Sequence, residues 1–543
     1  MPEYLRAFIV VITLTVTVFV VIQRPAIGII GPETFRRWRA AWVSLTVATF
    51  LIPGFWLFLA TATVIVLVVA AREPARPALY LLLVFTTPPI TQSIPGFAGI
   101  NRFFDIGWYQ LLALLLLLPA VMTRGRTSRQ KQAPRLPDVL FFLYFALFVV
   151  LTLRGTTFTD TMRTGFVVFL GMVLPYVVFS RWPRSGGDLR LLAAAFVLPL
   201  AVLAVIGIFE MLWGWHVYAA IGYGWGRHMG YVFRVEGLRA YASVLGPIQF
   251  GYVFMVGGGL LLLALGSRPR PRLRVTALAW MGAGLISSLS RGPMVGAAVL
   301  ALAFLSTGRG AFLNLVKLGL AGLVILMVAM PTPLGDRLIG MVPYVGDVDT
   351  GTIDYREQLY DNSMIVIQRN PLLGSVNYRD APEMQELIYF GMGTVDVVNT
   401  YLAVTLETGL IGLTLFCGFF FSVLFGLWRA VKALPDEEAD LKWAGRALLA
   451  TLAAILVTIA TVSSVGPIPL LYWTVAGLCV AQTGIIRRRL GEIEEQAINS
   501  RPRRSTLVPP DPVPLSPVRA RPAPASAVRP GSVGLKTNRR SGK

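Results

Sequence analysis

Long apolar stretches dominate this chain and restrict it to one class of fold. They cover most of residues 1–490 of the 543-residue sequence, with short polar segments between them. A helix needs about 20 mostly apolar residues to cross the hydrocarbon core of a bilayer. Hydrophobic residues make up 55% of the sequence and charged residues 14%, which excludes an ordinary soluble protein. The apolar windows are near residues 7–22, 40–71, 78–90, 107–122, 137–153, 163–180, 190–212, 244–266, 275–289, 292–307, 313–330, 397–427, 446–463 and 468–486.

These windows predict an all-α polytopic membrane protein with about 14 transmembrane helices, in a range of 12–15. The 40–71 window is long enough for two helices that turn at Pro53-Gly54. We expect, in order, a signal anchor with a connecting segment, a helical core, a large periplasmic loop, C-terminal membrane helices and a disordered basic, Pro-rich cytoplasmic tail. The corresponding boundaries are 1–39, 40–330, 331–396, 397–490 and 491–543.

The charge distribution predicts how the chain is oriented. The formal net charge is +21, and residues 500–543 alone hold ten Lys or Arg against one Asp. Further basic clusters lie in short loops, for example RRWR at 36–39 and RPRPRLR at 268–274. The positive-inside rule places these loops and the tail in the cytoplasm, so the basic excess reflects topology rather than nucleic-acid binding. The segments that then face the other side are 91–106, 154–162, 213–243, 289–292, 331–396 and 464–467.

The sequence offers little for metal or cofactor chemistry. Its two cysteines lie inside apolar windows, and it has only two histidines, His216 and His228. It has no Walker A motif, and GDVDTG at 346–351 lacks the rest of a metal-binding pattern. We therefore expect no cofactor and no metal.

Several arginines stand on the predicted non-cytoplasmic side, against the usual bias. They are Arg163, Arg234, Arg239, Arg291 and Arg356. Each has an ordinary explanation, which is that it reaches lipid headgroups or pairs with an acidic loop residue. Arg291 is harder to explain in this way, because the turn that holds it leaves almost no loop. A convergent set of guanidinium groups would bind phosphate or diphosphate.

Three stretches carry a resemblance to a known family. SSLSRGPMVG (287–296), YREQLYDNSMIVIQRNPLLGS (355–375) and VNTYLAVTLETGLIGL (398–413) resemble the signature regions of the O-antigen ligase and O-antigen polymerase superfamily. RVEGLRAYASVLGPIQFGY (234–252) and IPGFAGINRFFDIGWYQLLALLLLLP (94–119) are similar to its exopolysaccharide-associated members. The order of these stretches along the chain is more specific than any one of them.

The resemblance implies a multi-span enzyme with an integral-membrane glycosyltransferase fold in the bacterial inner membrane. Such enzymes act at the periplasmic face on glycans attached to undecaprenyl diphosphate. Polymerases join repeat units, whereas ligases move the finished chain to another acceptor. The resemblance also implies that Arg291 and Arg356 contact the diphosphate without a metal. The implied partners are the lipid-linked oligosaccharide and membrane lipid, with other polysaccharide assembly and export proteins as further candidates and no nucleic acid.

One position departs from the family pattern. Ligases carry His-Asn or a close variant, nine residues, then Gly-x-x-Gly, and here the corresponding residues are Val398-Asn399, Gly409 and Gly412. Valine neither accepts a proton nor donates a hydrogen bond. The departure favours a polymerase, or an inactive relative, over a ligase. His228 is a weak candidate to replace the missing histidine.

One carboxylate, Asp396, stands where a membrane helix should begin, and a second, Glu407, lies well inside that helix. If the helix starts near Asp396, Glu407 lies about 16 Å along it, where an isolated carboxylate in lipid is costly. At 100° per residue, Asp396, Thr400 and Glu407 fall within about 40° of one stripe and can face one cavity.

We expect Asp396 or Glu407 to be a catalytic base or an arginine partner, with Arg291 as the catalytic cation. The alternative is that Glu407 pairs with an arginine and only holds its helix. Asn399 caps the helix or binds sugar, and Tyr401 is assigned to substrate binding. We expect Gly409 and Gly412 to allow close helix packing.

Two rival functions remain open. A transporter or flippase for the same lipid-linked glycan would have paired broken helices and basic residues near the middle of the bilayer. An inactive scaffold would recruit cytoplasmic partners through the basic tail.

Overall fold

The computed structural model describes residues 1–96, 102–124, 135–225, 230–234, 237–244, 246–268, 271–308, 350–389 and 395–499, with isolated positions between 310 and 327. Most of the predicted span at 313–330, His228, most of GDVDTG and the tail beyond Asn499 lie outside these residues. The chain divides into two units, 1–492 and 493–543, and all elements below belong to the first apart from the last turns of α21.

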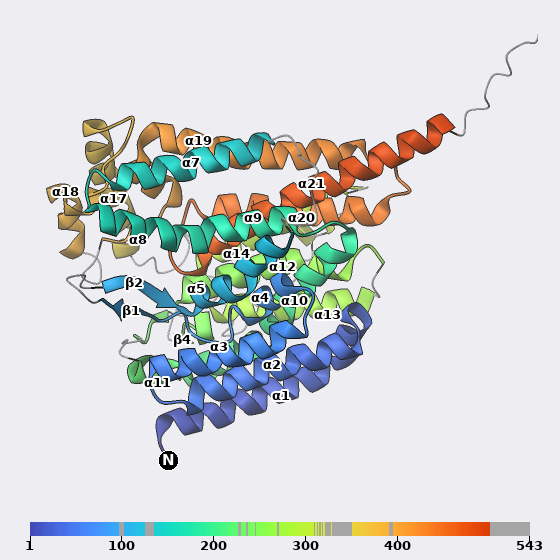
Figure 1. Cartoon of the computed structure of the whole chain (residues 1–543), viewed down its shortest axis with the longest axis horizontal. Coiled ribbons are helices and arrows are strands. Elements are labelled where there is room, and N and C mark those ends of the chain that lie inside the picture. The colour runs from blue at the N-terminus through green and yellow to red at the C-terminus, as the bar shows by residue number, and fades with distance from the viewer. Residues whose placement is uncertain are drawn as a thin grey trace, which may run out of the picture. The chain divides into compact units, whose positions relative to one another are not determined.

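Helices that run side by side along one direction form the first unit (Figure 1). Seven helical stretches of the described residues are long and apolar enough to cross a membrane, and four shorter apolar helices accompany them. The long ones are α1 (Glu3–Ile30), the α8 to α9 stretch (Phe158–Arg181), α10 (Gly186–Trp213), α12 (Pro247–Leu265), α19 (Thr400–Ala433), α20 (Ala439–Thr458) and α21 (Pro467–Asn499). The shorter ones are α3 (Phe55–Ala71), the Trp108–Met122 stretch, α7 (Leu136–Thr152) and α14 (Arg291–Ser306). The chain is thus an all-α, multi-pass membrane protein.

The remaining elements complete the bundle and its loops. The helices are α2 (Pro32–Leu51), α4 (Arg76–Leu83), α5 (Trp108–Leu112), α6 (Leu118–Arg124), α8 (Phe158–Val168), α9 (Leu174–Arg181), α11 (Ala219–Gly224), α13 (Pro271–Ser287), α17 (Thr350–Arg369) and α18 (Pro382–Gln385). Single turns of π-helix, η1 (Ala113–Leu117) and η2 (Phe169–Val173), join α5 to α6 and α8 to α9. Short 3₁₀ turns are η3 (Ala242–Val244), η4 (Tyr378–Asp380) and η5 (Glu386–Tyr389).

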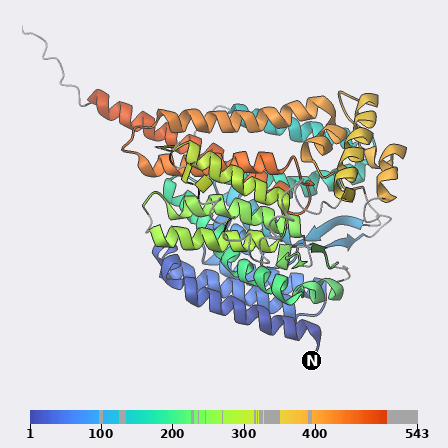
Figure 2. The ribbon, with the colours of Figure 1, turned by 180° about the vertical axis from the view of Figure 1, so that it is seen from behind.

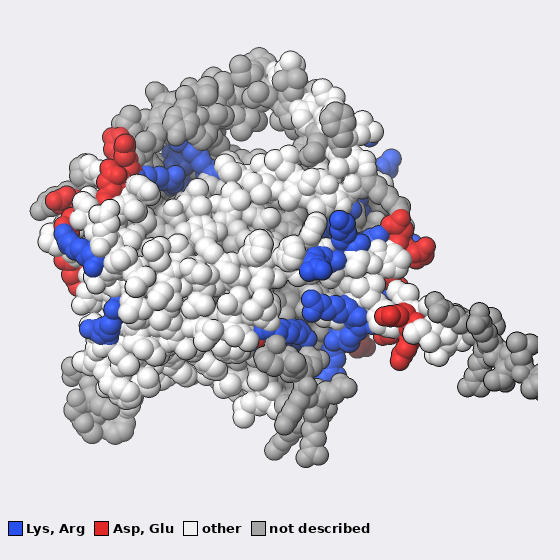
Figure 3. Space-filling model, turned by 90° about the horizontal axis from the view of Figure 1, so that it is seen from above, with Lys and Arg blue, Asp and Glu red and all other residues white. Residues whose placement is uncertain are grey.

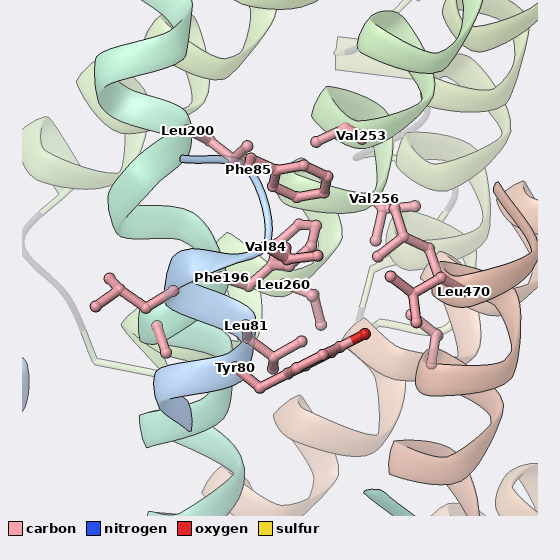
Figure 4. Packing of buried hydrophobic residues seen from close by; sticks show 14 of the residues in the cluster. Tyr80, Leu81, Val84, Phe85, Phe196, Leu200, Val253, Val256, Leu260 and Leu470 are labelled. Atoms are coloured by element: carbon pink, nitrogen blue, oxygen red, sulfur yellow. The ribbon is translucent and has the colours of Figure 1, made fainter. Parts of the chain in front are cut away.

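The apolar windows predict most helices correctly but fail at 78–90. The hairpin at Pro53-Gly54 forms as expected, between α2 and α3. The 78–90 window instead yields only the eight-residue helix α4, which is about 12 Å long and too short to cross a core of about 30 Å. Pro88-Pro89 stop a longer helix. The window is apolar because it is buried among helices (Figure 4), where Tyr80, Phe85 and their neighbours pack against α10, α12 and α21.

Two small antiparallel hairpins were not expected from the sequence. β1 (Thr91–Pro95) pairs with β2 (Arg102–Gly107), with Gln92 opposite Ile106. β3 (Phe233–Arg234) pairs with β4 (Gly237–Leu238). Both lie in loops, so the fold class stays all-α. These strands are too short for the alternation of apolar and polar residues to be recognised in such an apolar sequence.

The loops gather at two opposite ends of the bundle, as the alternation of charge predicts. The hairpin end holds both β-hairpins, the turn at 288–290, α17 and the loop 459–466. The basic end holds the loops at 72–75, 182–185 and 434–438 and the residues 266–268. Figure 3 shows charged side chains near the two ends of one face, with a mostly uncharged surface between them. Ion pairs that join segments at the basic end include Arg37–Glu73, Arg181–Asp138, Arg190–Asp440 and Arg489–Glu438.

The C-terminal half packs tightly. α14 and α12 both pack against α20, and α12 also contacts α10 and α13, as seen from behind in Figure 2. α7 lies along α19. This arrangement brings the three motif stretches of the sequence to the hairpin end.

The large loop after residue 349 forms a small body with its own apolar core. Leu359, Val366, Tyr378, Met384 and Leu406 are buried in it, and Val398 packs against them. Val398 is therefore part of an apolar cluster. At the edge of this body, Arg369 pairs with Glu383, whose pKa is lowered by the hydrogen bond from that guanidinium.

α19 is broken inside the bundle. Gly409 has φ 67° and ψ −169°, which divides the helix into two segments. A break in a membrane helix exposes backbone groups that need partners, because lipid supplies none. Here the segment 371–375 supplies them. The Leu410 N–H donates to the Pro371 carbonyl at 2.8 Å, and the Ser375 N–H donates to the Leu406 carbonyl at 2.7 Å.

The break requires glycine on both sides of the contact. A Cβ on Gly409 would lie 2.2 Å from the Leu372 carbonyl carbon, and one on Gly374 would lie 2.5 Å from the Leu406 oxygen. Gly374 also has a positive φ of 61°. The expectation that Gly409 serves helix packing is therefore wrong, because what approaches it is the backbone of a loop.

We predict that Gly409→Ala lowers the melting temperature in detergent, with a loss of about 2 kcal/mol or more from left-handed strain and the clash with Leu372. Gly426→Ala is the matched control, because Gly426 lies in the same helix and has no atom within 4 Å of an added Cβ. Equal melting temperatures for the two variants would contradict a rigid break.

Candidate active site

A cavity of about 200 Å³ lies at the hairpin end between α7, η2, η4, α19 and α21. One wall is aromatic, with Phe141, Tyr144, Tyr472 and Trp473. Besides the two tyrosines of this wall, the charged and hydroxyl-bearing residues that line the cavity are Asp396, Glu407, Arg379, Thr400, Ser463, Ser464 and Tyr378. Asp396, Thr400 and Glu407 thus share one cavity, as expected, but only Thr400 and Glu407 do so from the helix, because Asp396 lies in the non-helical segment before it. Aromatic faces beside a few polar groups form a surface suited to a sugar.

Glu407 lies closer to the helix end than expected. α19 begins at Thr400 rather than near Asp396, so Glu407 is about 10 Å along it and two residues before the break. Arg379 interacts electrostatically with Glu407, and its Nε donates to the Tyr378 hydroxyl at 3.1 Å. Burial raises the pKa of Tyr378 to about 12, so this phenol stays protonated. The carboxylate therefore faces a polar cavity and an opposite charge rather than lipid.

Asp396 is held on both its backbone and its side chain. The Tyr355 hydroxyl donates to the Asp396 carbonyl at 2.7 Å and accepts from its N–H at 3.0 Å. The Ser463 hydroxyl donates to the Asp396 carboxylate at 2.5 Å. Asp396 therefore joins α17 to the loop 459–466.

The next residues anchor the start of α19. Asn399 accepts hydrogen bonds from the N–H groups of Tyr401 and Leu402, which confirms that it caps the helix. The Thr400 hydroxyl donates to the Val462 carbonyl at 3.1 Å. The Tyr401 hydroxyl donates to the Leu456 carbonyl in α20 at 2.9 Å. A substrate contact by Asn399 or Tyr401 stays a prediction.

Arg234 and Arg239 both contact the turn 287–291, which contains Arg291. Arg239 donates from Nε to the Ser288 carbonyl at 3.3 Å and from Nη2 to the Ser290 hydroxyl at 2.9 Å. Arg234 donates to the Leu289 carbonyl at 3.0 Å. Burial, together with the charges of Arg234 and Arg291, lowers the pKa of Arg239 to about 10. The three like charges repel one another, and an anion beside them would relieve that repulsion.

The backbone of this turn is strained where the arginines hold it. Leu289 has φ 47°, a left-handed conformation that is costly for a residue other than glycine. The Ala240 N–H donates to the Ser287 carbonyl, which gives the turn a further support. Strain of this kind persists only where surrounding contacts enforce it.

The loop 459–466 connects the arginines with the carboxylates. Arg356, which is exposed on α17, donates to the Thr461 carbonyl at 3.3 Å. Gly292, next to Arg291, lies so close that an added Cβ would be 2.8 Å from the Thr461 hydroxyl. Two residues later in the loop, Ser463 contacts Asp396. Arg291 and Arg356 therefore flank the same loop that lines the cavity.

Arg163 lies apart from this set. It donates to the backbone carbonyls of Phe103 and Arg102 and pairs with Asp160 at 2.5 Å. These contacts attach β2 to α8. A substrate contact by Arg163 stays a prediction.

Three parts of the site do not stand out in the sequence. Arg379 is one of only four Lys or Arg among ten Asp or Glu at 331–396, which could have drawn attention to it. Arg154 donates to the carbonyls of Leu373 and Gly374 at 2.9 and 2.8 Å and so supports the segment that fills the helix break. Ser463 and Ser464 line the cavity from the loop 459–466, where the charge pattern predicts only that 464–467 faces the non-cytoplasmic side.

No group of three or more His, Cys, Asp or Glu side chains suited to a metal ion occurs within the described part of the chain. The positive charges at this site are guanidinium groups.

Residues 276–417 match the family model Wzy_C, described as O-antigen ligase. The match covers about a quarter of the chain and includes the arginine turn, α17 and the first segment of α19 with its break. The match contains the stretches 287–296, 355–375 and 398–413 that carry the resemblance, whereas the stretches 94–119 and 234–252, which resemble exopolysaccharide-associated members, lie outside it. No curated protein matches the chain at a significant level.

We predict that Arg239→Ala lowers the melting temperature, by the equivalent of about 3 kcal/mol, because two buried acceptors in the turn lose a charged donor. Arg239→Lys should recover little of this loss, since an ammonium cannot reach both acceptors as the guanidinium fork does. Arg487→Ala, at an exposed arginine of the basic end, is the control. An Arg239→Ala protein as stable as the control would show that the arginine does not hold the turn.

Proposed function

We propose that this protein polymerises a polysaccharide at the periplasmic face of the bacterial inner membrane. In this proposal it transfers a glycan from one undecaprenyl diphosphate to a sugar hydroxyl of another lipid-linked repeat unit. The supporting observation is that arginines and carboxylates meet around the loop 459–466, where Thr461 is next to Arg356 and Gly292 and Ser463 binds Asp396. The similarity of residues 276–417 to O-antigen ligases supports the same class of reaction.

The proposed reaction needs a base and a group that stabilises the leaving diphosphate. The acceptor hydroxyl attacks the anomeric carbon, the bond from that carbon to the phosphate oxygen breaks, and the lipid diphosphate leaves with the electron pair. Arg291 and Arg356 stabilise the negative charge that grows on the diphosphate, so the scheme requires no metal. Glu407 accepts the hydroxyl proton in the cavity.

Asp396 has a different role in this scheme. Its carboxylate already accepts the Ser463 hydroxyl, and its backbone is held by Tyr355. We assign it as a positioning residue that keeps the loop 459–466 beside α19. Arg379 orients Glu407 electrostatically.

Ligation onto another acceptor is the alternative within the family. Val398 stands at the position of the ligase histidine and packs in the apolar core of the α17 body. A valine there performs no proton transfer. This observation favours polymerisation.

A lipid-linked glycan transporter is the alternative from another class, and the broken helix α19 agrees with it in part. In transporters the unwound backbone lines a binding site. Here the Leu406 carbonyl and the Leu410 N–H are bonded to the segment 371–375 instead. The break therefore serves to attach the loop body to the helix.

We predict that Arg291→Ala leaves single repeat units on the lipid carrier in a deletion strain complemented with each variant. The measurement is glycan length on lipid-linked and exported polysaccharide, by gel and mass spectrometry, at matched protein level. Arg487→Ala should make chains of normal length. Full-length chains retained on the carrier would indicate a ligase, and repeat units retained on the cytoplasmic side would indicate a transporter. Normal chains with Arg291→Ala would refute the proposed catalytic role.

We predict that Glu407→Gln lowers the turnover number by about 10²-fold or more and leaves KM and the melting temperature nearly unchanged, because the variant has lost the proposed base. Asp396→Asn should instead lower the melting temperature, since an amide is a weaker acceptor for Ser463. If Glu407→Gln lost stability and kept its turnover, Glu407 would be a structural residue that only holds α19.

A further inference from the structure

A second cavity, of about 490 Å³, lies at the basic end between the ends of α12, α14, α19 and α20. Three cationic side chains line it, Lys432, Lys442 and Arg446, against one carboxylate, Asp436. Its size suits a small-molecule group, and its charge suits an anion. It lies at the opposite end of the bundle from the candidate active site, so its role is separate.

The cationic groups of this basic-end cavity are held in place. Arg446 donates to the Thr307 hydroxyl at 3.1 Å and to the Phe304 carbonyl at 2.8 Å, which fixes its guanidinium against the end of α14. Lys442 pairs with Asp436 at 2.6 Å. Lys432 lies over the Trp428 ring, 5.3 Å from its centroid. With one carboxylate against three cations, the lining keeps a net positive charge.

An indole forms a rigid wall of the same cavity. Trp443 donates from Nε1 to the Leu262 carbonyl at 2.7 Å. Arg274 lies 4.4 Å and Arg446 lies 5.9 Å from its ring centroid. The wall is therefore fixed before any ligand arrives, which lowers the entropic cost of binding.

An exposed strip of aromatic rings leads from the apolar span to this cavity. Phe421, Phe425 and Trp428, spaced by four and three residues on α19, lie on one face of the helix. They are 68%, 44% and 45% exposed. Phe421 stacks on Phe425 and Phe425 on Trp428, each pair with centroids 5.8 Å apart. Trp428 also lines the cavity, so the apolar strip is continuous with the charged site.

We propose that the basic-end cavity binds the phosphate headgroup of an anionic phospholipid, with an acyl chain along the strip formed by Phe421, Phe425 and Trp428. A phosphate there makes charge-assisted contacts with Lys432, Lys442 and Arg446. Basic pockets between membrane helices are suited to such headgroups. A soluble phosphate compound shares the headgroup chemistry, but it would make no use of the strip. The strip is the observation that favours the lipid.

The test is native mass spectrometry of the full chain, released from bilayers of defined composition. Phosphatidylglycerol should stay bound to the wild type, and phosphatidylcholine should not. The Lys432→Gln/Lys442→Gln double variant should bind phosphatidylglycerol on the order of tenfold more weakly. Arg487→Gln, at the same end but outside the cavity lining, should bind it like the wild type. Equal retention of both lipids, or no loss in the double variant, would overturn the proposal.

A second comparison separates the lipid from a soluble phosphate. Trp428→Leu should weaken phosphatidylglycerol binding several-fold, since the strip loses the ring that links it to the cavity. Inorganic phosphate and glycerol phosphate, added to the protein in detergent, should not displace the bound lipid at millimolar concentration. Displacement by either, with no effect of Trp428→Leu, would identify a site for a soluble phosphate and contradict the lipid assignment.

Discussion

The architecture of the hairpin end depends on one contact, the backbone of residues 371–375 inside the break of α19. A broken helix in a membrane protein needs partners for its freed N–H and C=O groups, and these residues provide them at 2.7 to 3.2 Å. Gly409 and Gly374 allow the two backbones to meet, and Arg154 holds the loop carbonyls from outside. The contact fixes the α17 body to α19 and so brings Arg379 and Tyr378 to the cavity that contains Glu407.

The loop 459–466 is the second point on which the site depends. It accepts hydrogen bonds from Arg356 on α17 and from Thr400 on α19, and it donates one to Asp396. It also contacts Gly292, beside the arginine turn. Arg356 and the turn that contains Arg291 come from two distant parts of the chain, and Asp396 comes from a third. All three lie around this loop. Such an arrangement suits a reaction in which a hydroxyl loses a proton while a diphosphate leaves with negative charge.

Arginines have two structural uses in this fold. In the first, they form ion pairs between neighbouring segments and stack on indole rings, for example Arg190 with Asp440 and Arg274 over Trp443. In the second, they donate to backbone carbonyls of turns and loops, as Arg154, Arg234 and Arg239 do at the hairpin end. The ion pairs and ring contacts join helices at the water-exposed end of the bundle. The second forces an unusual backbone to keep one conformation, as the positive φ of Leu289 shows.

The sequence by itself determined the class of fold, because the length and composition of an apolar helix follow directly from the thickness of a bilayer. It also determined local features with a local cause, such as the turn at Pro53-Gly54, the Asn399 cap and the shared face of Thr400 and Glu407. Only the tertiary structure decided that the 78–90 window is a buried half-length helix, that Gly409 breaks α19, and that Arg379 faces Glu407. These features depend on contacts between residues far apart in the chain. A pattern along the sequence carries no information about which backbone will approach a glycine.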